Sequence, residues 1–243
     1  HLCGHLYSFL LSSKLITYLP RRQAGNLKTK NIFPAIHLIV SGGHTTLLVM
    51  KDLFSFKKIG ETRDDAAGEA YDKVSRMLGL PYPGGPILEK LAKRGNPEAI
   101  NFPRPMLHQK NYDFSFSGLK TSVFYYVRNL SKLNFHRLKP DIAASFEKAV
   151  IDVLVAKTKS SMGAYGAKSI MLSGGVAANK NLRKNLAKTA KSFKIPFLVA
   201  PQKFNTDNAV MIGVAGYFAY LKKKTPLTSQ MGQGVKAWAH LNI

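Results

Sequence analysis

The sequence predicts an α/β protein, on three observations. Short apolar runs typical of buried strands alternate along the chain with longer segments whose apolar residues recur at helical spacing. Two of the apolar runs end in Ser-Gly-Gly, at 41–43 and 173–175, as expected where a strand enters a tight turn. No internal repeat of solenoid length interrupts the alternation. We therefore expect an α/β or mixed architecture.

Three strands are expected early in the chain. The basic segment 21–31 is poor in apolar residues, which predicts an exposed loop. IFPAIHLIVSGG (32–43) then predicts a buried strand, because its apolar run ends in two glycines. HTTLLVMKD (44–52) and FSFKKIGE (54–61) predict two further strands in a meander.

Helical segments follow. DDAAGEAYDKVSRMLGL (64–80) has apolar residues at helical spacing, with Asp64 or Asp65 as the expected N-cap. PYPGGP predicts a rigid loop before a short helix over 87–95. A turn followed by a helix is expected over 114–130.

The last part of the chain repeats the alternation. A long amphipathic helix is expected over 138–166, ending near glycines. Strand, double glycine and helix are then expected over 169–193, and another strand over 195–201. The final helix is expected within 206–224, with Asp207 near its start.

Charge is the strongest compositional signal. The chain has 36 Lys and Arg against 13 Asp and Glu, a formal net charge of +23. Such a field attracts polyanions such as nucleic acid, although a generally lysine-rich surface would explain the charge equally well. The single Cys3 cannot form an internal disulfide. No apolar run approaches the roughly 20 residues that a membrane helix needs.

The two Ser-Gly-Gly turns are candidates for phosphate binding. Glycines let backbone N–H groups approach a ligand closely, and such groups bind phosphate. One such turn is typical of ordinary loops, whereas two that end strands favour a nucleotide site between lobes. Neither turn belongs to a Walker loop or to a dinucleotide fingerprint.

His1 and His5 are candidate metal ligands. Residues at i and i+4 lie on one face of a helix, so both imidazoles can reach one cation. Asp207 stands where a helix begins, and an Asp there is most often an N-cap. Together the three would form a two-His, one-carboxylate site, which suits Fe(II) and is also acceptable to Zn(II). Cys3, at i+2, is expected on the other side of the helix.

Eight ordered motifs carry a family resemblance: HLCGH, IVSGGHT, ETRDDAAGEAYDK, LPYPGGP, DFSFSGLKT, DIAASFEKAV, SGGVAANKNLR and NTDNAVMIG. Together they resemble the tRNA threonylcarbamoyladenosine transferase family, once labelled O-sialoglycoprotein endopeptidases. SGGHT and FSGLKT resemble its bacterial and organellar branch. The resemblance implies the actin-like, Hsp70-like two-lobed ATPase fold. It also implies transfer of a threonylcarbamoyl group from threonylcarbamoyl-AMP to the adenosine 3′ of the anticodon, in tRNAs that read codons beginning with A.

The resemblance also implies the site residues. His1, His5 and Asp207 match the ligands of one divalent metal ion, expected to be Fe(II), with Zn(II) or Mg(II) as alternatives. The strand and turn that hold the phosphate and carbamoyl region of the acyl-adenylate are matched by Ile39, Val40, Ser41, Gly42 and Gly43. Positions around the nucleotide are matched by Asp72, Gly85, Glu89 and Asn179, and family members vary at the position of Glu89. No residue is assigned as a general base.

Three parts of the chain are expected from the same resemblance. They are a remainder of the N-terminal lobe with the metal-binding helix (1–60), an inserted or connecting helical region (61–140) and the C-terminal lobe (141–243). Family members carry further residues ahead of the His pair, including the first part of the N-terminal lobe, so we expect the later part of a longer protein.

Partners and location follow in the same way. The resemblance implies tRNA, threonylcarbamoyl-AMP, a dimerising paralogue and a small P-loop ATPase as partners, without a membrane. A cytoplasmic location is expected, with an organellar matrix left open.

Three other functions are weighed against this interpretation. A zinc peptidase of the HExxH class needs a Glu after its first His, and Leu2 stands there. A non-catalytic partner subunit typically loses the metal histidines and the SGGH turn, and this chain keeps both. A plain basic nucleic-acid module would be indifferent to adenylate and metal.

Overall fold

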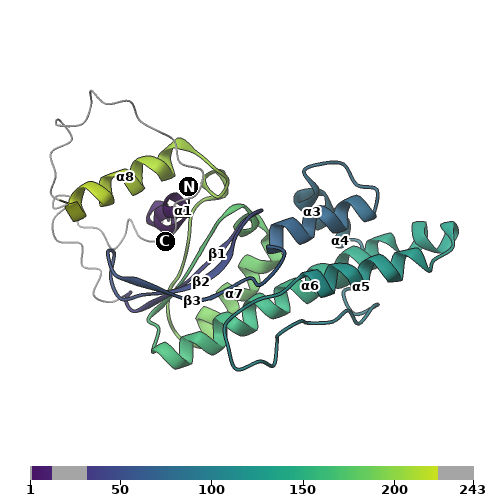
Figure 1. Ribbon diagram of the computed structural model, residues 1–243, viewed down its shortest axis with the longest axis horizontal. Helices are drawn as coiled ribbons and strands as arrows, with labels where there is room; N and C mark the ends of the chain where they lie inside the picture. Colours follow the sequence, from purple (N-terminus) through teal and green to yellow (C-terminus); the bar gives the residue numbers. More distant parts are fainter. Residues whose placement is uncertain (1, 13–31, 224–243) are drawn as a thin grey trace.

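The computed structural model describes residues 2–12 and 32–223 (Figure 1). In this part of the chain, five strands form one sheet in the order β3-β2-β1-β4-β5. The expected meander is confirmed, since β1 (Ala35–Val40), β2 (Thr45–Met50) and β3 (Phe56–Glu61) pair antiparallel. The strands β4 (Ser169–Ser173) and β5 (Phe197–Val199) then extend the sheet in parallel with β1.

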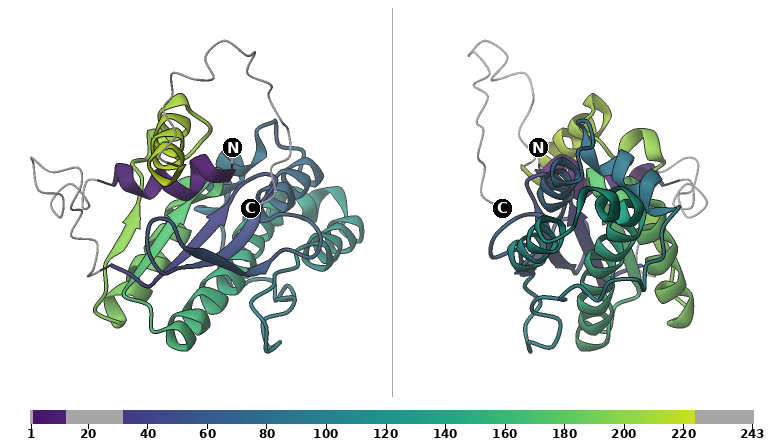
Figure 2. Two further views of the ribbon diagram at one scale, coloured as in Figure 1. Left: turned by 60° about the vertical axis from the view of Figure 1, so that its left-hand side comes forward. Right: turned by 90° about the vertical axis from the view of Figure 1, so that its right-hand side faces the viewer.

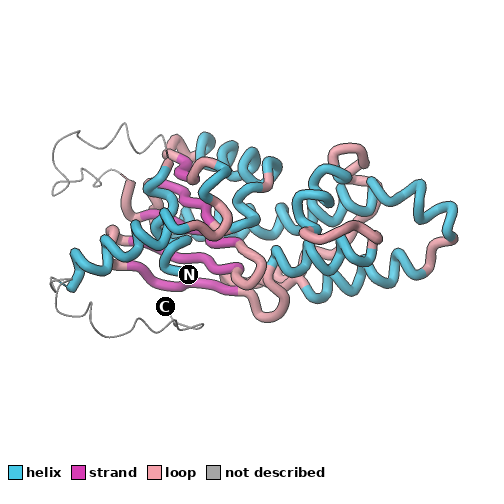
Figure 3. The backbone as a smooth tube through the Cα atoms, turned by 90° about the horizontal axis from the view of Figure 1, so that it is seen from above, coloured by secondary structure: helices cyan, strands magenta, loops and turns pink. Residues whose placement is uncertain are grey.

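Helices cover both faces of the sheet (Figure 2). One face packs against α6 (Lys132–Tyr165) and α7 (Lys180–Ser192), and its core continues among residues of α3 (Ala67–Met77), α4 (Gly84–Ala92) and α5 (Ser117–Arg128). The other face packs against α1 (Leu2–Tyr7), the 3-10 turn η1 (Ser8–Leu11) and α8 (Ala209–Lys223). The far end of α6 and the neighbouring helices extend beyond the sheet (Figures 1 and 3).

The alternation of side chains in each strand builds two cores. In β1, Ile36, Leu38 and Val40 join the core beneath α3 to α7, whereas Ala35 and Ile39 join the core beneath α1 and α8. Successive side chains of a strand point to opposite faces, so a strand covered on both sides is apolar throughout. This is why the run IFPAIHLIV lacks the alternating polar pattern of a half-exposed strand.

The start of α3 corrects one prediction. The N-cap is Ala66, which makes no side-chain cap bond, so the expected cap at Asp64 or Asp65 is wrong. The Asp64 carboxylate instead accepts hydrogen bonds from the backbone N–H groups of Phe116 and Ser117, 2.8 and 3.2 Å away. Asp65 pairs with Lys73 and Lys120, each at 2.7 Å. The roles of Asp64 and Asp65 are therefore determined by contacts with distant segments, which a local sequence pattern does not show.

Two helices begin earlier than expected. The helix α4 starts at Gly84, inside the segment expected to be a loop, and α6 starts at Lys132 rather than near 138. Pro140 lies inside α6, where it removes one backbone donor. Tertiary packing of the buried α6 residues from Ile142 onward outweighs this local penalty. As expected, the helix ends near glycines: Gly166 caps it with φ 57°.

The helices and strands described above do not test the predicted loop or the predicted division into lobes. The predicted loop 21–31 lies outside the described residues. The single sheet joins strands from the predicted first segment, 1–60, and from the predicted last one, 141–243. The division of the chain into lobes therefore stays a prediction. Within residues 2–12 and 32–223, no helix has the length and apolar character to cross a membrane.

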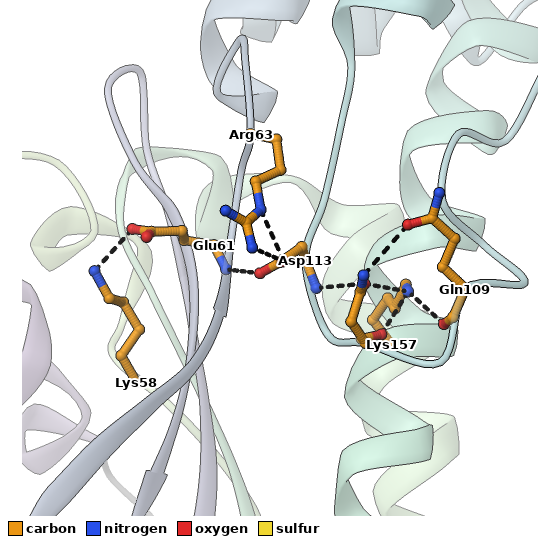
Figure 4. A network of polar contacts seen from close by, with 7 residues as sticks. Lys58, Glu61, Arg63, Gln109, Asp113 and Lys157 are labelled. Carbon is orange, nitrogen blue, oxygen red and sulfur yellow. Dashed lines mark hydrogen bonds and ion pairs between the residues drawn. The ribbon is translucent and has the colours of Figure 1, made fainter.

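A buried lysine fastens the loop before α5 to α6 (Figure 4). Lys157 is 2% exposed, and its ammonium donates to the backbone carbonyls of Gln109 and Asn111 at 3.1 and 2.6 Å. Burial lowers the pKa of Lys157. Asp113, two residues after Asn111, accepts a hydrogen bond from the backbone N–H of Glu61 in β3. The loop therefore links the edge strand to the long helix.

We expect Lys157→Met to lower the free energy of unfolding by about 1–3 kcal/mol, because the Gln109 and Asn111 carbonyls would lose the hydrogen bonds from its buried ammonium. The matched control is Lys159→Met, since Lys159 is exposed on the same helix; its effect should stay within about 0.5 kcal/mol. Urea unfolding measures both. Equal midpoints for the two variants would contradict the role of Lys157.

Candidate functional site

The two Ser-Gly-Gly turns lie side by side at the end of the sheet where β1 and β4 finish. The parallel strands β1 and β4 pair with Ile39 opposite Ser173, so their carboxyl ends reach the same edge. Gly174 has φ 93° and ψ 167°, and a Cβ there would lie 2.2 Å from the carbonyl oxygen of Val40. Only glycine allows this approach, and the two turns are therefore in direct contact.

The first turn, Ser41 to His44, exposes its two glycines. The Ser41 N–H donates to the His44 carbonyl at 2.7 Å, and the His44 N–H donates to Ser41 Oγ at 3.1 Å. A Cβ on Gly42 or Gly43 would meet nothing within 4 Å, so their backbone is open to an approaching group. Ile39 and Val40, by contrast, bury their side chains in the two cores.

The helix α3 starts against this turn. The Gly68 N–H donates to the Ser41 carbonyl at 3.2 Å, and the Ala67 N–H donates to Thr45 Oγ1 at 2.8 Å. A Cβ at Gly68 would lie 2.6 Å from the Ser41 oxygen, so a larger residue would push the helix away. The turn and the positive end of α3 thus lie together, an arrangement that favours anions.

The second turn leads to Asn179, whose amide is held at both ends. Its Oδ1 accepts the Leu182 N–H at 2.8 Å and caps α7, and its Nδ2 donates to Glu147 Oε1 at 2.7 Å. Asn181 Nδ2 donates to the other Glu147 oxygen at 2.5 Å. Burial raises the pKa of Glu147, the two amides lower it, and the nearby Glu89 raises it further.

Glu89, Asp72 and Gly85 come from α3 and α4. Glu89 Oε1 accepts the Lys180 N–H at 3.2 Å, which brings this carboxylate to the start of α7 beside Asn179. Asp72 Oδ1 accepts the Gly84 N–H at 3.0 Å and so joins the two helices. A Cβ on Gly85, the next residue, would meet nothing within 4 Å. The predicted nucleotide residues Glu89 and Asn179 are therefore close together, and Asp72 and Gly85 meet at the neighbouring start of α4.

His5 and Asp207 are in contact on the face of the sheet that α1 and α8 cover. His5 Nε2 lies 3.2 Å from Asp207 Oδ1, and the side chains are 1% and 68% exposed. Close packing of α1 on α8 allows this, because a Cβ on Gly4 would lie only 3.0 Å from the Met211 side chain. Burial lowers the pKa of His5, and Asp207 partly offsets the effect. The neutral imidazole that burial favours is the form that binds metal.

Asp207 is not the cap of α8. Asn208 Oδ1 accepts the Met211 N–H at 3.0 Å, the contact typical of an N-cap side chain. The Asp207 carboxylate is directed to His5 instead. His44, at the end of the first turn, also lowers the pKa of His5, so the turn lies within electrostatic reach of the pair.

The third predicted ligand, His1, lies outside the described residues, and of Cys3 only the backbone, within α1, is described. Within 2–12 and 32–223, no group of three His, Cys, Asp or Glu side chains is close enough to hold a metal ion. The metal site and the substrate site therefore stay predictions, with one ligand pair in contact.

Sequence reasoning missed a buried polar pair and a buried carboxylate. His37 and Ser173, 136 residues apart, form a 2.8 Å hydrogen bond between β1 and β4, and burial lowers the pKa of His37 to about 3. Glu147 anchors both asparagines at the start of α7. A histidine inside IHLIV and a glutamate inside the apolar stripe of AASFEKAV were the available signals.

Comparison with known proteins gives one consistent family. The sequence model described as TsaD: tRNA N6-adenosine threonylcarbamoyltransferase matches residues 22–214. Curated proteins of that name are similar to this chain: one from Moorella thermoacetica is 47% identical over 92% of the chain, and one from Bacillus licheniformis is 48% identical over 91%. The chain spans 61% and 60% of the length of these two relatives.

Solved structures agree on the fold. The crystal structure of full-length HypF in the phosphate- and nucleotide-bound form matches 90% of this chain and 42% of its own, with a TM-score of 0.63 at 14% identity. HypF from T. kodakarensis matches 76% of this chain and 34% of its own, with a TM-score of 0.55 at 15% identity. At such identities only the fold carries over, and it is the actin-like ATPase fold expected from the motifs.

Proposed function

The chain belongs to the tRNA N6-adenosine threonylcarbamoyltransferase family, and we propose that it serves that family's reaction. In this reaction the threonylcarbamoyl group passes from threonylcarbamoyl-AMP to the exocyclic amine of the adenosine 3′ of the anticodon, in tRNAs that read ANN codons. One observation carries the proposal beyond family membership. Two Ser-Gly-Gly turns meet at the carboxyl ends of β1 and β4, and a histidine and an aspartate from distant parts of the chain are in contact within electrostatic reach of His44 in the first turn.

The turns supply the proposed phosphate contacts. The backbone at Gly42 and Gly43 is open, and the start of α3 adds a positive helix end next to it. Such groups stabilise a phosphate without any side-chain charge. Ser41 shapes this turn through its bond from the His44 N–H, while Ile39 and Val40 anchor it in the sheet.

The proposed nucleoside contacts come from Asp72, Gly85, Glu89 and Asn179. A carboxylate such as Asp72 or Glu89 can accept ribose hydroxyls. The amide of Asn179 offers a second N–H donor besides the one that Glu147 accepts. The open Cα of Gly85 leaves space for a ligand at the start of α4.

The donor set fits a divalent metal ion. An imidazole and a carboxylate 3.2 Å apart suit Fe(II) or Zn(II), and His1 is the proposed third ligand. We propose Fe(II), with Zn(II) or Mg(II) as alternatives. Bound there, a metal would polarise phosphate or carboxylate oxygens and so stabilise departing AMP.

In the proposed step, the adenosine amine attacks the acyl carbon of threonylcarbamoyl-AMP. A C–N bond forms, the bond between that carbon and the phosphate oxygen breaks, AMP leaves and the amine loses one proton. The amine is a poor nucleophile, so positioning and electrostatic stabilisation supply most of the rate enhancement.

Proposed partners are a dimerising paralogue and a small P-loop ATPase, and the proposed location is the cytoplasm.

Uptake of labelled threonine tests the proposal. The complete protein, with its partners and threonylcarbamoyl-AMP, should label a tRNA that carries the target adenosine. A matched tRNA with another base at that position should bind almost equally well and stay unlabelled, because only adenosine presents the reacting amine there. Equal labelling of the two tRNAs, or none with an intact, metal-loaded complex, would overturn the proposal.

A further inference from the structure

The charge of this chain is unevenly distributed. Of the 13 acidic residues, 12 lie between residues 52 and 152, and only Asp207 follows. Helix α7 lies in this almost acid-free part and carries four lysines along one side: Lys180, Lys184, Lys188 and Lys191. We call these four residues the lysine strip.

Helical geometry places the lysine strip on one exposed face. At 100° per residue, spacings of four, four and three residues keep the four side chains within an arc of about 80°. All four are exposed, while Leu182, Leu186, Thr189 and Ala190 bury the opposite side of α7. Successive lysines are about 5–6 Å apart along the axis. That distance is comparable to the separation of neighbouring phosphates in one nucleic-acid strand.

The strip contrasts with ion-paired lysines at other helices. Lys73, Lys93 and Lys148 each pair with a carboxylate one helical turn away. In the described part of the chain, no member of the strip has an ion-pair partner. Four like charges on one side of a helix repel each other, a local penalty that a bound polyanion would relieve.

We propose that the lysine strip binds the sugar-phosphate backbone of the RNA whose base reacts at the Ser-Gly-Gly edge. This inference rests on the proposed function and adds the surface that holds the substrate. The strip begins beside the candidate site: Asn179 caps α7, and Glu89 accepts the N–H of Lys180. An RNA strand that lies along α7 from Lys180 towards Lys191 would therefore begin beside the candidate site, where the target base is expected.

The composition of α7 favours RNA over a membrane surface. A helix that lies on a bilayer needs an exposed apolar face, and the large apolar residues of α7 are buried against the sheet. The other exposed side chains of α7 are Asn185, Ala187 and Ser192, which are small or polar. Long, mobile ammonium groups over small residues suit contact with phosphates independently of base sequence.

The test is salt-dependent tRNA binding by the complete protein, measured by fluorescence anisotropy. Lys184→Glu/Lys188→Glu should weaken binding about tenfold or more near 0.1 M salt, and should flatten the slope of log affinity against log salt by about 1.5–2. The neutral pair Lys184→Gln/Lys188→Gln should flatten the slope similarly with a smaller loss. The matched control is Lys110→Glu/Lys132→Glu, which changes net charge equally at exposed positions in the loop before α5 and at the start of α6.

The control should keep more than half of the native affinity and nearly the native slope. Equal losses in strip and control variants, or an unchanged slope in the strip variants, would overturn the inference. Failure of the proposed function would give a different experimental result. The protein with its native strip would then bind tRNA without transferring label, whereas a failed strip with a sound function would leave labelling intact in the strip variants.

Discussion

Gly174→Ala is expected to lower the free energy of unfolding by about 3 kcal/mol or more, a large loss for the addition of a single methyl group. The backbone at Gly174, with φ 93° and ψ 167°, lies in a region that is essentially restricted to glycine. The added methyl group would also lie 2.2 Å from the Val40 carbonyl oxygen, so the two turns would have to separate. Urea unfolding monitored by circular dichroism measures the loss.

Gly175→Ala is the matched control. The next residue has no positive φ, and its Cβ would meet nothing within 4 Å. The same methyl group there should change the unfolding free energy by less than about 1 kcal/mol. Comparable losses at 174 and 175 would show that the tight approach of the two turns has no special importance.

The second large effect concerns metal content. In the complete protein, Asp207→Ala should weaken metal binding by about 100-fold or more, because loss of a ligand exceeds the 10–100-fold effect of losing an outer partner. Elemental analysis after dialysis against trace metal measures the bound ion without reference to activity. Full occupancy in this variant would remove Asp207 from the ligand set.

Asn208→Ala separates the metal role from helix capping. Its Oδ1 accepts the Met211 N–H, so this variant should lose about 1 kcal/mol of stability and keep its metal. Asp207→Ala should show the opposite pattern, since Asp207 is exposed and is directed to His5. A similar stability loss in both variants, with metal retained in both, would return Asp207 to a structural role.

Local patterns predicted the elements well where burial determines them. The run from Ile32 to Gly43 and the meander after it follow from apolar runs and glycines, which are signals within a few residues. The starts of α3 and α6 were missed because distant groups decide them. Asp64 is held by Phe116 and Ser117, about 50 residues away, and Pro140 is tolerated because the face after it is buried.

The candidate site shows the same division. The motif resemblance supplied Gly42, Glu89, Asn179 and Asp207, and the structure brings Glu89 to Asn179 and Asp207 to His5. Glu147 was missed, because its place in an apolar stripe signals burial but not its partners, the amides of Asn179 and Asn181 at the start of α7. Spacing along the chain shows which residues share a face, whereas contacts between α6 and α7 depend on the whole fold.

The pairing of β1 with β4 has a consequence for biosynthesis. The hydrogen bond between His37 and Ser173 joins residues 136 positions apart, with the α3 to α6 helices between them. At about 5–20 residues per second, translation of these 136 residues leaves β1 without this neighbour for roughly 7 to 27 seconds. During that interval the nascent β1-β2-β3 hairpins present an unpaired apolar edge, which is prone to self-association. Co-translational chaperones should therefore bind this chain after the meander emerges and release it once β4 is made.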